Sequence, residues 1–408
     1  MNIALLGFGT VGSGVYDLLL KNYDNIKNKY GEEVNIKHIL VRNVSKRSNH
    51  KSFELFTDDF CRIVEDEHID LVIEVLGGVH PAYEYIKKSL QQKRYVITAN
   101  KEVIALHGKE LMQEAQKNGV ALLYEASVAA AIPIIDIMTR ALAGDEILEI
   151  TGIINGTTNF ILTEMKEKRI SFNAALKIAQ ESGYAESCPD SDILGLDVAR
   201  KLVILTFLAY GVYIAVDSFN TEGIEKISFN DIEYADRLGY EIKLLAISRK
   251  EQNKVSAVVA PFLVSKEQLL ASVKGVNNAV MVKCDAADDM LFIGKGAGKY
   301  PTASAIMGNI IHIITNKSYN PINNTVKSYS QDLKEQLYKY HIRFETPEAA
   351  FMNNALETYL CPEINSYKFI DNNVIIITEK CSGKIVEQLI DKLKAVYNVQ
   401  DFIKIRVF

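Results

Sequence analysis

The stretch NIALLGFGTVG, residues 2–12, joins an apolar run to glycines at positions 7, 9 and 12. The apolar run predicts a buried strand, and the pattern behind the glycines predicts a helix. Glycines at this spacing permit a tight turn, close approach of a pyrophosphate to the backbone, and phosphate binding at the helix N-terminus. We expect this turn to bind a dinucleotide rather than merely to join a strand to a helix. The expected binding residues are Gly7, Phe8, Gly9, Thr10, Val11 and Gly12.

The first third of the chain repeats this alternation of strand and helix. Apolar, β-branched runs follow at residues 35–42, 69–76, 94–99 and 120–126. Continuous apolar runs are typical of parallel strands, and the segments between them have the spacing of amphipathic helices. The pattern predicts an α/β fold with an N-terminal Rossmann dinucleotide-binding domain over residues 1–133.

The remaining chain predicts two further domains. Residues 134–320 mix helices with β-rich runs, which indicates a second, α+β domain with a mixed sheet. Within it, residues 171–209 predict a long helix broken around GYAESCPDSD, and Leu202–Val216 predicts a buried helix running into a strand. Residues 337–408 follow a strand-helix-strand-strand-helix-strand order, which predicts a ferredoxin-like domain.

Composition limits the partners that the chain can have. A net charge of -5 over 408 residues supplies no positive field for nucleic acid, and no apolar stretch reaches the ~18 residues that span a bilayer. The start lacks a basic region before its apolar run, so we expect a cytoplasmic protein with no membrane partner. Five cysteines without a CxxC pair, and seven histidines without ligand spacing, indicate neither a disulfide framework nor a transition-metal site.

Three groups of polar residues are candidates for cofactor binding or catalysis. Arg42 follows the second strand, where a carboxylate would otherwise bind the ribose, and this favours NADP(H) over NAD(H) while leaving NAD(H) open. Lys101 follows the strand at residues 94–99, at the ligand-binding edge of a parallel sheet. Asp197 and Lys201 are four residues apart on one helix face, where a surface ion pair is the alternative. The apolar continuation after Lys201 predicts a partly desolvated lysine whose proton is easier to donate.

Six strings, in this order, resemble the homoserine dehydrogenase family: GFGTVGSGV, TANKEVIALHG, YEASVAAAIPII, GIINGTTNFILTEM, GYAESCPDSDILGLDVARKLVIL and GKGAGKYPTASA. The resemblance covers residues 1 to about 320. It implies that residues 134–320 form the substrate-binding, catalytic and dimerisation domain, and that about residues 300–320 complete the dinucleotide-binding domain. It implies NAD(P)H-dependent reduction of L-aspartate 4-semialdehyde to L-homoserine in threonine, methionine and isoleucine biosynthesis, in a homodimer or homotetramer. The C-terminal domain resembles an ACT domain, in which the turn after the first strand usually contains Pro-Gly; here residues 345–349 contain Pro347 without a glycine.

The resemblance also implies roles for single residues. Lys201 matches the family's proton-donating lysine, Asp197 the carboxylate one turn before it, and Lys101 the lysine between cofactor and substrate. Glu186 and Asp192 match substrate-binding positions, and Gly298 lies in the loop that closes over the nicotinamide. A sodium ion would be held by backbone carbonyls of Glu125, Val128, Ala130 and Ile132, although many members have glycines where this chain has Ala130 and Ala131.

Two other functions fit parts of the sequence. An aspartate-semialdehyde dehydrogenase combines a dinucleotide fold with a related substrate, but it needs a nucleophilic cysteine, and no cysteine here lies in an activating motif. An amino-acid-sensing protein could retain the dinucleotide fold without catalysis. The presence of Lys101, Glu186, Asp197 and Lys201 together argues against such a loss of activity.

Overall fold

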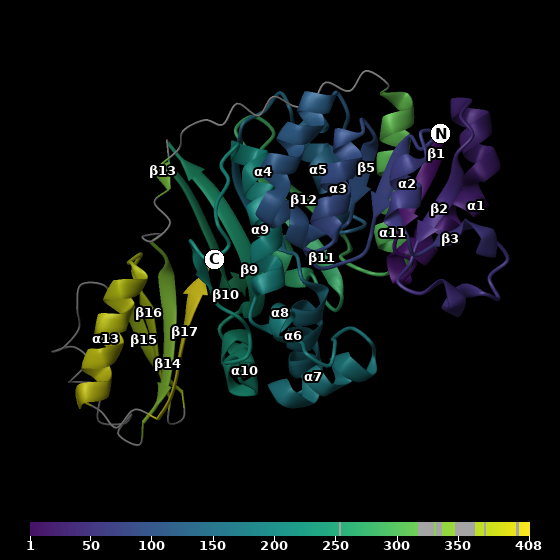
Figure 1. Ribbon diagram of the computed structural model, residues 1–408. Coiled ribbons are helices and arrows are strands. Elements are labelled where there is room, and N and C mark those ends of the chain that lie inside the picture. The colour runs from purple at the N-terminus through teal and green to yellow at the C-terminus, as the bar shows by residue number, and fades with distance from the viewer. Residues whose placement is uncertain (253, 317–329, 332–336, 347–363, 371–372, 397–399) are drawn as a thin grey trace. The chain divides into compact units, whose positions relative to one another are not determined.

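The computed structural model describes residues 1–252, 254–316, 330–331, 337–346, 364–370, 373–396 and 400–408 (Figure 1). The chain forms two compact units. The first contains residues 1–147, 200–216 and 283–328, and the second contains residues 148–199, 217–282 and 329–408. Helix α9 (Leu196–Tyr210) begins in the second unit and continues in the first. None of the described helices has the length and apolar character needed to cross a membrane.

The first unit is built on a parallel sheet in the order β3-β2-β1-β4-β5-β6. This is the strand order of the doubly wound dinucleotide-binding fold. Strands β1 and β4 are buried along nearly their whole length, as their continuous apolar runs predict. The strands are β1 (Asn2–Leu6), β2 (Asn35–Leu40), β3 (Phe56–Thr57), β4 (Leu71–Glu74), β5 (Tyr95–Thr98) and β6 (Leu122–Leu123).

Helices cross between these strands, and a late segment of the chain completes the unit. Helix α11 packs against α1, and both contribute to the core that covers β1. The helices are α1 (Thr10–Tyr30), α2 (Phe60–Glu65), α3 (Ala82–Gln91), α4 (Lys101–Asn118) and α11 (Lys299–Thr315). Short turns of helix lie at η1 (Val44–Arg47), η2 (Phe53–Leu55), η3 (Glu125–Ser127), α5 (Ile134–Asp136) and η4 (Ile137–Ala141), and strand β12 spans Asp289–Lys295.

The second unit is built on a mixed sheet in which strands follow the order β11-β7-β9-β10-β17-β14-β16-β15. Its first strands are β7 (Ile147–Ile153), β8 (Asn220–Thr221), β9 (Tyr240–Glu251), β10 (Lys254–Ser265) and β11 (Asn277–Cys284). Its helices are α6 (Gly156–Lys168), α7 (Phe172–Glu181), α8 (Asp190–Ile193) and α10 (Phe229–Arg237), with a short turn at η5 (Leu269–Ser272). The predicted break around GYAESCPDSD is the segment between α7 and α8.

The C-terminal residues join this sheet through their last strand. Strand β17 pairs in parallel with β10 and antiparallel with β14, so the strands of residues 337–408 continue the sheet of the second unit. The described elements are β13 (Ser330–Gln331), β14 (Lys339–Glu345), β15 (Ile364–Ile370), β16 (Asn373–Thr378), α13 (Gly383–Val396) and β17 (Gln400–Val407). The first helix of the predicted ferredoxin-like order and the turn at Pro347 lie outside the described residues, so the ACT assignment stays a prediction.

The predicted strand at the end of Leu202–Val216 is wrong. Helix α9 ends at Tyr210, and residues 212–215 have no regular secondary structure, although Val212 and Ile214 are buried. Gly211 adopts a left-handed φ of 69°, which ends the helix. Val212 and Ile214 pack into the core without pairing to a neighbouring strand. An apolar run predicts burial, but it does not show whether the buried residues form a strand.

A buried lysine on β9 makes the stability of the second unit depend on pH. Lys243 is 3% exposed, and its Nζ donates to Asn159 Oδ1 at 3.2 Å and to the carbonyl of Val273 at 2.5 Å. Burial lowers the pKa of Lys243 to about 8. Below pH 8 the folded and unfolded chains both carry the proton, whereas between pH 8 and the ordinary lysine pKa of 10.5 only the unfolded chain does.

We therefore expect stability to rise between pH 8 and 10.5 by on the order of 3 kcal/mol from this group alone. The thermal midpoint of the wild type should rise over this window relative to that of Lys243→Met, which has a side chain of similar length but no titrating group. Scanning calorimetry at several pH values measures the difference. Parallel midpoints for the two proteins across the window would contradict the prediction.

Candidate active site

The glycine-rich turn leaves space at the N-terminus of α1. Gly7 has a φ of 108°, and a Cβ there would lie 2.8 Å from the carbonyl oxygen of Val75. A Cβ on Gly12 would lie 2.1 Å from the carbonyl oxygen of Gly7, so both positions require glycine. Gly9 caps α1 without a side-chain hydrogen bond, and a Cβ there would meet no atom within 4 Å. The turn thus offers unobstructed helix N–H groups, which suit a phosphate.

The loop containing Gly298 lies beside this turn. Gly298 has a φ of 121° and precedes α11, whose first residue, Lys299, packs against α1. A Cβ on Gly14 would lie 2.8 Å from the carbonyl oxygen of Lys299, and Lys299 Nζ also pairs with Asp17 at 2.7 Å. The structure therefore brings two sequence-predicted cofactor positions, the glycine-rich turn and Gly298, to one end of the first unit.

The basic loop after β2 contacts the turn through a residue that our sequence analysis did not select. Arg42 is exposed, whereas Arg47 donates from Nη2 to the carbonyl of Phe8 at 3.0 Å. The Arg47 guanidinium also lies over the Phe8 ring, 5.4 Å from its centroid. The rings of Phe8, His50 and Phe56 pack edge to face with centroids 5.0–5.3 Å apart, and so fix this loop against the turn.

A buried hydrogen-bond network orders the loop that carries Lys101. Glu74, at the end of β4, is fully buried and accepts from Thr98 Oγ1 at 2.5 Å and from the backbone N–H of Leu76 at 2.7 Å. Burial raises the pKa of Glu74. Asn100 caps α4 through its Oδ1 and donates from Nδ2 to the carbonyl of Gly78 at 2.7 Å. Lys101, half-buried, is therefore the first residue of a firmly anchored helix.

The two candidate lysines lie on neighbouring helical turns of the first unit. Arg200 Nη1 pairs with Glu102 Oε1 at 3.2 Å. Because Glu102 follows Lys101 and Arg200 precedes Lys201, this pair joins the lysine-bearing turns of α4 and α9. Lys201 is 8% exposed and is followed by fully buried Leu202, so the predicted partial desolvation of this lysine is confirmed.

The second unit brings Asp192 and Asp197 together. Asn155, at the end of β7, donates from Nδ2 to Asp192 Oδ1 at 2.7 Å and to Asp197 Oδ2 at 2.9 Å. Asp197 is buried, on the first turn of α9, and Lys201 follows one helical turn later. Glu186 is exposed, and its backbone carbonyl accepts from Gln180 Nε2 at 3.1 Å. Asn155 was not among the predicted site residues, although NGTTN at the start of a helix is a capping signal.

In the loop at residues 125–133, two alanines adopt a backbone conformation that glycine usually adopts. Ala129 and Ala130 have φ values of 54° and 37°, in the left-handed region that glycine favours. The side chain of Glu125 is buried and accepts from the backbone N–H groups of Ile135 at 2.9 Å and Asp136 at 2.8 Å. The carbonyls of Glu125 and Ile132 each accept one backbone N–H, which leaves each oxygen a second lone pair.

Histidine, cysteine and acidic side chains do not gather into a metal-binding group anywhere in the described residues. The four described cysteines are free, and of these Cys61 and Cys188 are exposed. Cys284 is buried, and burial raises the pKa of its thiol. A raised pKa disfavours the thiolate that a nucleophilic cysteine needs.

Two family models match most of the chain. The model described as homoserine dehydrogenase, NAD binding domain, matches residues 7–125, and the model described as homoserine dehydrogenase matches residues 133–311. The homoserine dehydrogenase of Bacillus subtilis is 36% identical over 355 residues, which cover 85% of this chain and 82% of the relative.

Solved structures agree with these matches. The crystal structure of a homoserine dehydrogenase from Thiobacillus denitrificans has a TM-score of 0.92 and 34% identity, and the match covers 100% of this chain and 98% of that one. A hyperthermophilic archaeal homoserine dehydrogenase in complex with NADPH has a TM-score of 0.68 and 27% identity over 78% of this chain and 99% of that one. With the dinucleotide-binding sheet and the lysine-bearing α9 in place, the chain belongs to the homoserine dehydrogenase family.

Proposed function

We propose how the family's reaction, NAD(P)H-dependent reduction of L-aspartate 4-semialdehyde to L-homoserine, is divided among the residues of this chain. The bound dinucleotide supplies the hydride. Lys201 stabilises the negative charge that develops on the aldehyde oxygen and donates the proton that completes the hydroxyl group. The observation that carries this assignment is the burial of Lys201 on an apolar helix, beside the turn that bears Lys101.

The other polar residues hold the substrate and orient the donor. Asp197, one turn before Lys201, orients the lysine or its water. Glu186 and Asp192 supply carboxylates for the ammonium group of the substrate, and Lys101 supplies a cation for its carboxylate. The same residues act in the reverse direction, in which Lys201 accepts the hydroxyl proton.

Initial rates with aspartate semialdehyde and each reduced cofactor test the reaction directly. We expect turnover, measured as loss of absorbance of the reduced nicotinamide, and no acyl phosphate production. Acyl phosphate turnover would instead indicate an aspartate-semialdehyde dehydrogenase. Cofactor binding without turnover of either substrate would indicate a sensing protein.

We infer that NADP(H) is the preferred cofactor. Arg42 and Arg47 lie in the loop after β2, in which the usual ribose-binding carboxylate is missing from the sequence, and Arg47 contacts Phe8 of the glycine-rich turn. The archaeal relative in complex with NADPH supports this preference. NAD(H) lacks the 2′-phosphate, so the positive charges of these two arginines increase its binding affinity less than that of NADP(H).

Replacing Arg42 by glutamate should raise the KM for NADPH on the order of tenfold more than the KM for NADH, because a carboxylate repels the 2′-phosphate. Steady-state kinetics with both cofactors measure the two KM values. Lys37→Glu, on the same β2 segment, gives a control for the change of net charge. An equal response of both cofactors to Arg42→Glu would mean that Arg42 is only a solvated loop residue.

A sodium ion is the second group that the family implies. The carbonyls of Glu125, Val128, Ala130 and Ile132 would hold it, in a loop where Ala129 and Ala130 adopt left-handed φ values of 54° and 37°. Carbonyl oxygens are suitable ligands for a hard cation. A bound ion would stabilise the path of this loop, and no hydride or proton step is assigned to it.

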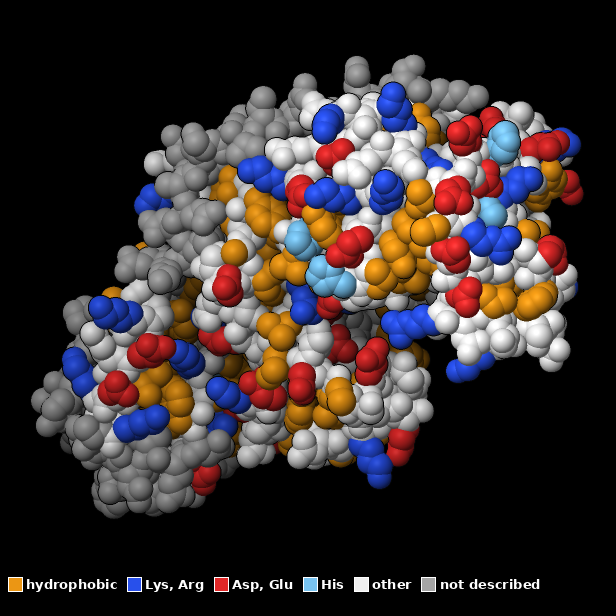
Figure 2. Space-filling model, viewed as in Figure 1, with side chains coloured by type: hydrophobic (Ala, Val, Ile, Leu, Met, Phe, Trp, Pro, Cys, Tyr) orange, Lys and Arg blue, Asp and Glu red, His pale blue; other side chains and the backbone are white. Residues whose placement is uncertain are grey.

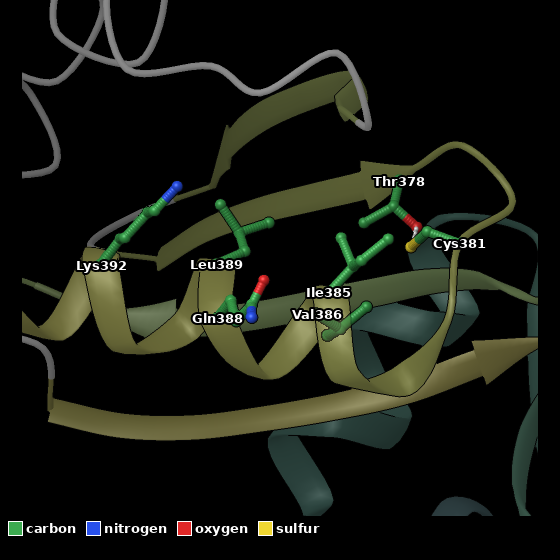
Figure 3. A pocket seen from close by; sticks show the side chains of 7 residues that line it. All are labelled: Thr378, Cys381, Ile385, Val386, Gln388, Leu389 and Lys392. Atoms are coloured by element: carbon green, nitrogen blue, oxygen red, sulfur yellow. Dashed lines mark hydrogen bonds between the residues drawn. The ribbon is translucent and has the colours of Figure 1, made fainter. Parts of the chain in front are cut away.

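We propose that residues 337–408 contribute to the assembly of subunits more than to feedback inhibition by an amino-acid effector. Figure 3 shows a pocket between β16 and α13, in which Cys381 Sγ donates to Thr378 Oγ1 at 3.6 Å. An amino-acid effector needs a cation for its carboxylate and a carboxylate for its ammonium group. The lining offers Lys392, but its described residues include no acid: Thr378, Cys381, Ile385, Val386, Gln388, Leu389 and Lys392.

The partners that we propose are small molecules and further copies of the chain. On the face drawn in Figure 2, acidic and basic side chains are interspersed, in keeping with the small net charge of -5. Such a surface gives no extended positive region for a phosphate backbone on that face. The homodimer or homotetramer and the cytoplasmic location remain predictions.

A further inference from the structure

The side chain of Asn155 is held in one orientation at the start of α6. Its backbone is extended, with φ -130° and ψ 112°, and its Oδ1 accepts from the backbone N–H of Thr158 at 2.8 Å. This is the usual N-cap arrangement, for which asparagine is among the best residues. Because Oδ1 is committed to the cap, the amide cannot turn over without losing that hydrogen bond, and Nδ2 must face the other way.

The two hydrogens of Nδ2 reach two carboxylates that are distant in sequence. Nδ2 donates to Asp192 Oδ1 at 2.7 Å and to Asp197 Oδ2 at 2.9 Å, across 37 and 42 residues. Asn155 is 4% exposed and Asp197 is 2% exposed, so the hydrogen bond between them lies in an interior where unmatched polar groups are costly, whereas Asp192 is half-buried. One amide group therefore uses both of its N–H groups and one lone pair of its oxygen to connect the start of a helix with two acids.

The start of α6 also anchors the segment between α7 and α8. Thr157 Oγ1 donates to the carbonyl of Tyr184 at 2.6 Å, near the beginning of that segment. Asn155 binds Asp192 in α8, just beyond its end. Residues 155–157 thus hold both sides of the segment that contains Glu186, independently of the cap on Thr158.

We propose that Asn155 is a positioning residue for the reaction, which sets the places of the Asp192 and Asp197 carboxylates relative to each other. The inference rests on the roles proposed above for Asp192, Asp197 and Lys201. Small displacements of catalytic groups cost large factors in rate, so a fixed link between substrate-binding and donor-orienting acids has catalytic value.

A neutral donor suits this position better than a charged one. Lysine or arginine could also donate to both carboxylates, but their positive charge would compete with the ammonium group of the substrate for Asp192. An amide holds the two acids in place and leaves their negative charge available. The carboxylates in turn satisfy both amide hydrogens.

Two substitutions of Asn155 remove its hydrogen bonds to Asp192 and Asp197 but keep an acceptor that caps α6. Asn155→Asp is close to isosteric and keeps an acceptor for the N–H of Thr158, but it places a third carboxylate against Asp192 and Asp197. Asn155→Ser keeps a cap acceptor and removes the two amide N–H groups without adding charge; its single hydroxyl is on a shorter side chain and cannot donate to both acids. We expect kcat to fall about tenfold for Asn155→Ser and about 100-fold for Asn155→Asp, with the Kd for NADPH unchanged within about twofold.

An isotope effect distinguishes positioning from general loss of structure. With reduced cofactor deuterated at the transferred hydrogen, the primary isotope effect on kcat should increase in both variants, because a misplaced donor slows the chemical step relative to product release. Ser171→Ala is the matched control, since it removes the N-cap of neighbouring α7, where Ser171 Oγ accepts from the N–H of Ala174. It should lower the thermal midpoint and leave kcat and the isotope effect unchanged.

Parallel assays of Asp197→Asn and Lys201→Met show whether a negative result concerns the positioning role of Asn155 or the proposed roles of Asp197 and Lys201. If those variants lose turnover while both Asn155 variants keep wild-type kcat and isotope effect, only the positioning role is wrong. If Asp197→Asn and Lys201→Met keep full turnover, the proposed roles are wrong and this inference falls with them. A loss of kcat in Ser171→Ala equal to that in Asn155→Ser would also overturn it.

Discussion

Lys201→Met should lower kcat by a factor on the order of 10² or more while cofactor binding persists. Methionine has a similar length and fills the same buried position on α9, where Lys201 is 8% exposed. It can neither donate a proton nor stabilise the charge on the aldehyde oxygen. Steady-state rates at saturating substrate give kcat, and fluorescence titration gives the Kd for the cofactor.

Lys201→Arg divides the two roles of this side chain. Arginine retains a positive charge, but its pKa is too high for it to release a proton at neutral pH. We therefore expect Lys201→Arg to recover part of the electrostatic stabilisation and little of the proton transfer, so its kcat should lie between those of Lys201→Met and the wild type. Lys177→Met, on the exposed face of α7, is the control and should be fully active. Near-normal turnover of Lys201→Met would mean that water or Lys101 supplies the proton.

The strands of the first unit are the part of the fold that sequence patterns predict best. Runs that are apolar on both faces became β1, β4 and β5, because buried parallel strands need such residues throughout. Strand β2 is buried only at its last two residues, Ile39 and Leu40. Strand β3 was missed, since Phe56–Thr57 is too short to show any periodicity. The run at residues 120–126 gave only the two residues of β6, because the chain turns into η3 at Glu125.

Some residues of the candidate site can be recognised from the sequence around them, whereas others can be recognised only once the fold is known. The glycine-rich turn and the spacing of Asp197 and Lys201 are local, so the sequence alone could select them. Glu74 is the last residue of an apolar strand, a signal that was present but has many structural explanations. The role of Asn155 depends on Asp192 and Asp197, which reach it only through the fold of the second unit.

The attachment of the C-terminal strands to the sheet of the second unit could not be predicted from the order of elements. Arg343 lies in the middle of β14, where a charged residue would normally indicate an exposed face. Instead, its side chain is 2% exposed and pairs with Asp231 on α10, whose side chain is 1% exposed. The pairing of β17 with β10 and this ion pair are two independent connections within one unit.

Arg343→Met should destabilise the second unit by about 3–5 kcal/mol, the usual cost of leaving one partner of a buried ion pair uncompensated. Arg343 Nε donates to Asp231 Oδ1 at 2.6 Å, and Nη1 donates to Asn373 Oδ1 at 3.0 Å. Without the guanidinium, the Asp231 carboxylate stays buried with only its capping hydrogen bonds from Ser228. Amide hydrogen exchange in β10 and β17 measures the loss as faster opening of these strands.

The double variant Arg343→Met, Asp231→Asn shows whether the buried charge causes this loss. Asparagine can still cap α10 but carries no charge, so the double variant should recover much of the stability that Arg343→Met loses. Lys404→Met is the surface control: Lys404 pairs with Glu387 at 2.9 Å, with Glu387 64% exposed, and its loss should cost less than about 1 kcal/mol. Equal effects of Arg343→Met and Lys404→Met would mean that the buried pair does not hold β14 against α10. The strands of residues 337–408 would then depend on their other connections, such as the pairing of β17 with β10 and the ion pair of Arg406 with Glu222 at 3.0 Å.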